Sequence, residues 1–111
     1  PSPRDSRKLP AMIDSQALEV WLETEGAARA LVPYVRSAEP ASAGWRLRLT
    51  REHRGGRSDI RQSGTVSLAA GVPQRLSSTA AGREDGDRCS VEIEITEGDR
   101  TVRLFRFECP R

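Results

Sequence analysis

The sequence has few of the residues on which metal sites, membrane spans and large aromatic cores depend. Its 111 residues include two cysteines and a single histidine, His53. These three residues could complete a tetrahedral zinc site only with help from a carboxylate. No apolar run approaches the length of a membrane-spanning helix. Hydrophobic residues make up 36% of the chain, so we expect one domain with a modest core.

The sequence also lacks a recognisable catalytic motif. No Ser or Cys near His53 forms a nucleophile elbow or a triad pattern, and we interpret His53 as a solvated loop residue. The acidic segments 84–87 and 97–99 could bind calcium weakly, but neither has EF-hand spacing, and acidic residues are common in turns. We therefore expect no enzymatic activity, no cofactor and no metal site.

The chain is richest in signals for β-strands. Over residues 89–97, Cys89, Val91, Ile93 and Ile95 alternate with polar residues, which predicts a strand with one buried and one solvated face. A turn at 98–99 and a second β-rich run to Phe107 complete a hairpin.

The register of this hairpin depends on the length of its loop. A two-residue loop would set Val91 opposite Arg106 on the core face. A three-residue loop, 98–100, gives the pairs Ile93 with Phe105, Val91 with Phe107, Glu92 with Arg106, and Cys89 with Cys109. The second register keeps the apolar residues together, so burial favours it.

Cysteines that lie directly opposite in a hairpin are within disulfide range. The alternative is a pair of buried free thiols, but burial of the apolar residues favours this register independently of the cysteines, and we predict a Cys89–Cys109 disulfide. A persistent disulfide implies the periplasm or the outside of the cell.

Residues 1–16 hold three prolines and mixed charges without periodicity, which predicts a disordered tail ahead of a domain at 17–111. The chain begins at Pro1 rather than at a methionine. A cleaved signal peptide and an arbitrary end of the sequence are both compatible with this start.

The whole domain is predicted to be all-β, a seven-stranded immunoglobulin-like β-sandwich. The expected strands are 18–23, 28–36, 45–50, 59–68, 72–79, 89–97 and 101–107, with loops at 39–44 and 51–58. The predicted core consists of Trp45, Leu47, Leu49, Val91, Ile93, Phe105 and Phe107.

Arginine supplies every one of the 18 basic residues except Lys8. This bias reflects either genome composition or selection for arginine chemistry. The arginines between residues 46 and 61 form a candidate binding surface: Arg46, Arg48, Arg51, Arg54, Arg57 and Arg61. Pairing with Glu92 and Glu94 on a neighbouring strand could neutralise the first two. The remaining surplus suits an acidic, unfolded partner, whereas a net charge of +2 is too small to imply nucleic acid.

The order of these features over about residues 17–110 resembles the curli assembly chaperone family, CsgC and especially CsgH. The resemblance rests on VPYVR at 32–36, on the segment 45–78 with SLAAGVP at 67–73, and on the hairpin that runs from GDRC at 86–89 to FECP at 107–110. The C-x-C pair of CsgC is absent from the matching region 42–45, so no thiol exchange is carried over.

The resemblance implies a small periplasmic protein, exported by a signal peptide, that keeps the unfolded curli major subunit (CsgA-like) from polymerising prematurely. The six arginines would then bind this client through transient charge contacts, or a sheet edge would pair with it. A monomer without membrane span is expected. The alternative is an immunoglobulin-like extracytoplasmic interaction or adhesion module with a folded partner.

Overall fold

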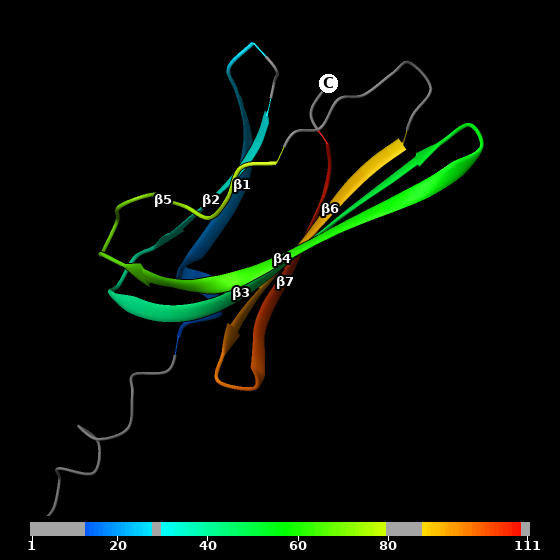
Figure 1. Cartoon of the computed structure of the whole chain (residues 1–111). Coiled ribbons are helices and arrows are strands. Elements are labelled where there is room, and N and C mark those ends of the chain that lie inside the picture. The colour runs from blue at the N-terminus through cyan, green and yellow to red at the C-terminus, as the bar shows by residue number, and fades with distance from the viewer. Residues whose placement is uncertain (1–12, 28–29, 80–87, 110–111) are drawn as a thin grey trace, which may run out of the picture.

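The computed structural model describes residues 13–27, 30–79 and 88–109, which form two antiparallel sheets and one short 3-10 helix (Figure 1). The elements in chain order are η1 (Ser15–Ala17), β1 (Leu18–Glu25), β2 (Ala30–Ser37), β3 (Ala41–His53), β4 (Gly56–Leu68), β5 (Gln74–Arg75), β6 (Arg88–Glu97) and β7 (Arg100–Glu108). The all-β prediction is confirmed. In the described part of the chain no helix is long and apolar enough to cross a membrane.

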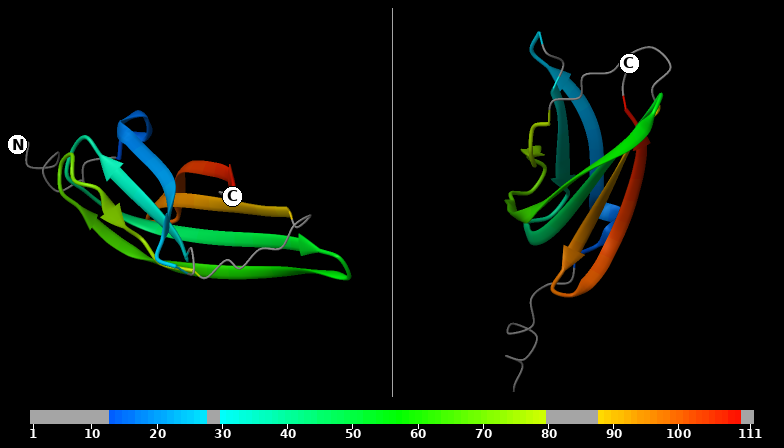
Figure 2. Two further views of the ribbon diagram at one scale, coloured as in Figure 1. Left: turned by 90° about the horizontal axis from the view of Figure 1, so that it is seen from above. Right: turned by 45° about the vertical axis from the view of Figure 1, so that its right-hand side comes forward.

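The strands are ordered β1-β2-β5 in one sheet and β4-β3-β6-β7 in the other. The two sheets form separate layers (Figure 2), and the chain crosses between them after β2 and again after β4. β3 lies between β4 and β6, so the segment around Trp45 and the segment around Ile93 are neighbours, as the sequence predicted.

The core lies between the two sheets. Five of the seven predicted core residues are buried: Trp45, Leu47, Leu49, Val91 and Ile93. The prediction is only partly right for Phe105 and Phe107, which are half-buried and pack against the core from β7. β7 is an edge strand, so its side chains have sheet neighbours on one side only. β2 completes the core from the opposite layer with Leu31 and Val35.

The β6–β7 hairpin has the predicted strand register but a different loop. Ile93 pairs with Phe105 and Val91 with Phe107, yet Glu97 pairs with Arg100 across a two-residue turn. A β-bulge beside Ile95 and Thr96 reconciles these pairings, because it adds one residue to β7. The prediction of a three-residue loop was therefore wrong. The Cys89–Cys109 disulfide is confirmed, with 5.3 Å between the two Cα atoms.

The β3–β4 hairpin is much longer than the sequence predicted. Segments 41–44 and 51–53, expected to be loops, belong to β3, and β4 already begins at Gly56. Thirteen consecutive residue pairs join the two strands, and only Arg54 and Gly55 form the turn. Gly55 has a φ of 95°, which favours glycine. The strand expected at 72–79 shrinks to β5 and one bridge between Leu31 and Thr79.

Residues that precede β1 already contact the rest of the fold. Ile13 is buried, and its backbone N–H donates to the Glu97 carboxylate at 3.3 Å. Arg103 Nη1 donates to the Ser15 carbonyl at 3.1 Å. These contacts join the start of the described chain to the β6–β7 hairpin, ahead of the domain start predicted at residue 17. Residues 1–12 of the predicted tail lie outside the described residues.

Candidate functional site

The candidate surface is the solvent-facing side of the four-stranded sheet. Residues directly opposite in an antiparallel pair share one face of the sheet. Arg48 pairs with Arg61, Arg46 with Ser63, and Glu52 with Arg57. Since Leu47 and Leu49 are buried on the core side, these polar residues lie on the outer side. Four of the six predicted arginines therefore share one face: Arg46, Arg48, Arg57 and Arg61.

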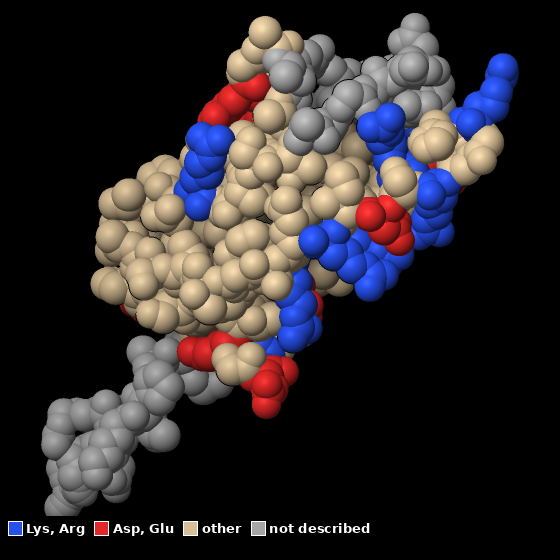
Figure 3. All heavy atoms as spheres, in the orientation of Figure 1, with Lys and Arg blue, Asp and Glu red and all other residues tan. Residues whose placement is uncertain are grey.

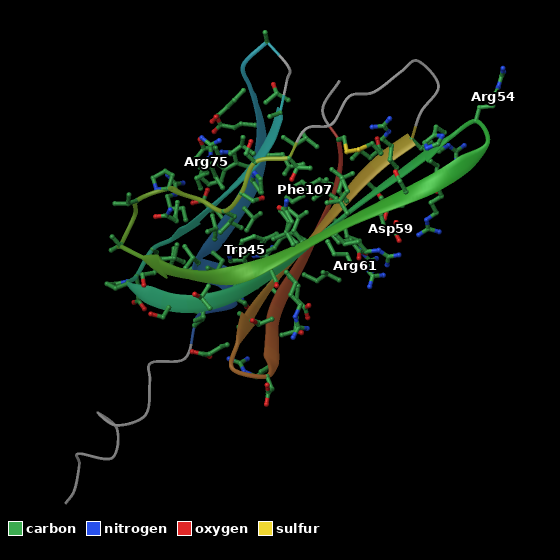
Figure 4. The ribbon with its side chains drawn as sticks, viewed as in Figure 1. Trp45, Arg54, Asp59, Arg61, Arg75 and Phe107 are labelled. Atoms are coloured by element: carbon green, nitrogen blue, oxygen red, sulfur yellow. A yellow bond between two sulfur atoms is a disulfide. The ribbon has the colours of Figure 1, made fainter. Side chains whose placement is uncertain are left out.

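The structure separates the other two arginines from this face. Arg51 pairs with Cys89 and Ser58, which places it on the same side of the sheet as the disulfide. Arg54 lies in the hairpin turn and extends away from the rest of the protein (Figure 4). The predicted set is thus one group of four arginines on the outer face, with one arginine on the core side and one at the tip.

Acidic side chains from neighbouring strands occupy part of the outer face. Arg46 pairs with Glu94 at 3.4 Å, which is one of the pairings that the sequence left open. Arg48 instead pairs with Asp59 at 3.1 Å, although Glu92 lies opposite it on β6. The reason is competition from β7, where Arg106 lies opposite Glu92 and binds it at 2.9 Å.

Asp59 lies within reach of two arginines on the β3–β4 hairpin. Besides Arg48, Arg57 Nε approaches its carboxylate to 3.6 Å. The hydrogen bond from Arg48 is the main reason why the pKa of Asp59 is lowered from its usual 3.8; a bond from Thr50 and the charges of both arginines act in the same direction, while desolvation opposes them. Asp59 is therefore ionised at neutral pH and holds these two arginines in place.

The positive charge that remains is concentrated along β4 and at the tip. Within the described residues, no ion pair or hydrogen bond involves the side chain of Arg54 or Arg61. Figure 3 shows basic side chains following the β3–β4 hairpin, with an acidic group between them. The uncompensated positive charge involves fewer arginines than the sequence suggested, and it lies at the margin of the four-stranded sheet.

A shallow open groove of about 520 Å³ crosses this face between β4 and β7. Arg46, Arg48 and Arg61 line it together with Glu92 and Glu94. Leu104 of β7, with 46% of its surface exposed, adds an apolar patch. Sequence reasoning missed Leu104, although the alternation of β7 with β6 would have placed it opposite Glu94. The groove offers both signs of charge and one apolar contact.

The outer face of the three-stranded sheet carries stacked aromatic rings and paired charges. Trp21 and Tyr34 stack with their ring centroids 5.7 Å apart, and Arg36 lies over the Trp21 ring. Glu25 accepts a hydrogen bond from the Tyr34 hydroxyl at 2.7 Å and pairs with Arg75 at 2.9 Å. The hydrogen bond to Glu25 is the main cause of a raised pKa for Tyr34. Because these polar groups satisfy one another, this face offers less uncompensated charge than the β4 margin.

No group of three or more His, Cys, Asp and Glu side chains could hold a metal ion in the part of the chain that the structure describes. The acidic segment 84–87 lies outside the described residues. In the other acidic segment, Glu97 binds the Ile13 N–H and pairs with Arg100 at 2.6 Å. His53 is exposed, and its Nδ1 lies 3.4 Å from the Arg54 carbonyl oxygen.

Comparison with solved structures finds two similar proteins. The E. coli curli protein CsgC matches over 85% of this chain and 99% of its own length, with a TM-score of 0.67 and 19% sequence identity. CsgH from R. palustris matches over 82% of this chain and 89% of its own, with a TM-score of 0.64 and 15% identity. No family model and no curated protein sequence matches the chain. The predicted resemblance to CsgC and CsgH is confirmed at the level of the fold.

Proposed function

We propose that this protein is a non-enzymatic periplasmic chaperone that delays amyloid assembly of an unfolded curli major subunit (CsgA-like). The observation that supports this function is the arginine surface along β3 and β4, on a fold similar to those of CsgC and CsgH. The immunoglobulin-like character of the sandwich is part of the same proposal. The protein would act as a monomer and without a cofactor.

Charge accounts for how such a chaperone would meet its client. An unfolded acidic chain is attracted to exposed arginines, which raises the rate of encounter without requiring a fixed complex. Arg54 and Arg61 have no ion pair within the described residues, so they can contact a client without first breaking one. Exposed ion pairs contribute only about 0–1 kcal/mol, so Arg46 and Arg57 can also exchange partners at little cost.

The test is a fibrillation time course of a curli major subunit with increasing amounts of this protein. We expect the wild type to lengthen the lag phase. The double variant Arg54→Glu/Arg61→Glu should need at least about a threefold higher concentration for the same delay, because charge complementarity is lost. Inhibition by the wild type should also weaken as salt rises, since the Debye length is about 8–10 Å at physiological ionic strength.

The matched control is Arg36→Glu/Arg75→Glu, which changes the net charge equally but lies on the three-stranded sheet. Arg36 and Arg75 pair there with Glu19 and Glu25. We expect this control to inhibit like the wild type once its folding has been checked by circular dichroism. Equal inhibition by both double variants would exclude the arginine surface, and no delay by the wild type would refute the chaperone function.

A further inference from the structure

β4 forms an open margin of the four-stranded sheet. It is the terminal strand in the order β4-β3-β6-β7, and no described strand pairs with its far side. β4 runs for 13 residues, and only Leu68 at its end is buried. In an antiparallel edge strand, every second residue directs its N–H and C=O away from the sheet. The long margin therefore presents a row of backbone donors and acceptors.

Proteins usually protect such an edge with proline, lysine, a bulge or a charge pointing toward the core side. β4 contains no proline or lysine, and its pairing with β3 is uninterrupted from His53–Gly56 to Ala41–Leu68. Its charged residues, Arg57, Asp59 and Arg61, all lie on the outer face. The opposite margin differs, because β7 carries a bulge and places Arg103 opposite Ile95 on the core side.

The side chains of β4 indicate what kind of strand could be added. The core-side face carries Ile60, which is 37% exposed, and the half-buried Val66. Between them, Gly64 lies against the Trp45 indole, and the Gln62 Oε1 atom is buried without a hydrogen-bond partner in the described structure. An added strand could cover Ile60 and the exposed part of Val66. On the other face, an acidic residue would meet Arg61.

Charge distinguishes β4 from the margin formed by β1. β1 carries Glu19, Glu23 and Glu25 and no basic residue, and the neighbouring Arg36 and Arg75 are engaged by Glu19 and Glu25, so β1 has no surplus positive charge to attract an acidic segment. β4 carries two arginines and one aspartate, and that aspartate is engaged by Arg48 and Arg57.

We propose that the β4 margin is a pairing site for an extended, unfolded polypeptide segment that is β-prone and carries an acidic residue. The inference rests on the proposed function, since the occupant is a β-prone segment of the amyloid subunit. Pairing with β4 occupies backbone groups that the segment needs in order to add to a growing fibril. The arginines attract the unfolded segment, and backbone hydrogen bonds to β4 retain it.

The decisive variant is Ile60→Lys, which places a positive charge on the core-side face of the edge. This is a device by which natural edges reject added strands, so we expect at least about a fivefold higher concentration to be needed for the same lag-phase delay. If inhibition depended on charge attraction alone, Ile60→Lys would inhibit at least as well as the wild type, because the variant is more basic. The matched control is Val72→Lys, which adds the same charge at an exposed apolar residue of the β4–β5 connection, outside the groove, and should inhibit at least as well as the wild type.

Hydrogen exchange of the wild-type protein gives a second readout that does not depend on the variants folding. Adding the freshly unfolded curli major subunit should slow exchange at alternate amides of β4 and leave β7 unchanged. Unchanged β4 exchange, or full inhibition by a folded Ile60→Lys protein, overturns the edge proposal while the chaperone function stands. Slower β4 exchange in the protein alone at high concentration would instead assign the edge to a second copy. Failure of the wild type to delay fibrillation refutes the proposed function itself.

Discussion

At the scale of single residues, Asp59 organises the charges of the outer face. Its carboxylate accepts a hydrogen bond from Arg48 and lies near Arg57, which leaves Arg61 as the unpaired basic residue of this strand among the described residues. The sequence places four arginines of segment 51–61 near only two acids, Glu52 and Asp59. Only the strand register shows which of these arginines are neutralised.

We predict that Asp59 titrates below its usual pKa of 3.8, because ionisation is favoured by the hydrogen bond from Arg48. A depressed pKa contributes stability that is present above the unfolded value and is lost as the pH falls through the folded value. The contribution should therefore persist at pH 4–5 and disappear only in stronger acid. Carboxyl NMR titration measures this pKa, and Arg48→Gln should raise it. An unshifted wild-type value would mean that the Arg48–Asp59 pair does not form in solution.

At the scale of elements, the two long hairpins behave differently. In β6–β7 the apolar alternation sets the register, and the bulge adjusts the turn to it. In β3–β4 the tip lies far from the core, and its residues are mostly exposed charges. Judged by composition alone, segment 51–58 resembles a loop. Backbone pairing keeps it extended, and such pairing leaves no pattern of hydrophobic residues in the sequence.

The disulfide closes the open end of the β6–β7 hairpin, where the Cys109 N–H also donates to the Cys89 carbonyl at 3.0 Å. We expect Cys89→Ala to lower the free energy of unfolding by about 2–4 kcal/mol without changing the fold, because the unfolded chain regains the freedom of the closed loop. Urea denaturation gives this value, and reduced wild type is the control. A loss below about 0.5 kcal/mol would show that the strand pairing alone holds this end.

At the scale of the whole molecule, the residues that stabilise the fold and the residues proposed to bind the client lie on opposite faces of the same strands. β3 buries Leu47 and Leu49 between the sheets and exposes Arg46 to solvent. Because alternate residues point to opposite faces, the outer surface can change without disturbing the core.

Leu47 tests this separation, since it is 4% exposed and lies between the two sheets. Leu47→Ala should cost about 2–5 kcal/mol of unfolding free energy through lost burial and a cavity. The exposed substitution Leu104→Ala on the same sheet is the control and should cost far less. Thermal or chemical denaturation compares the two, and similar costs would contradict the position of β3 in the core.

The sequence by itself determined the all-β class, the β6–β7 register, the disulfide and most of the core, because each follows from alternation between neighbouring residues. The tertiary structure decided which arginines share a face, which acids neutralise them and which strand forms the open margin. These properties depend on the order of strands in the sheet and on competition between partners such as Arg48 and Arg106 for Glu92. Residues far apart in the chain set that competition, so no local pattern records its outcome.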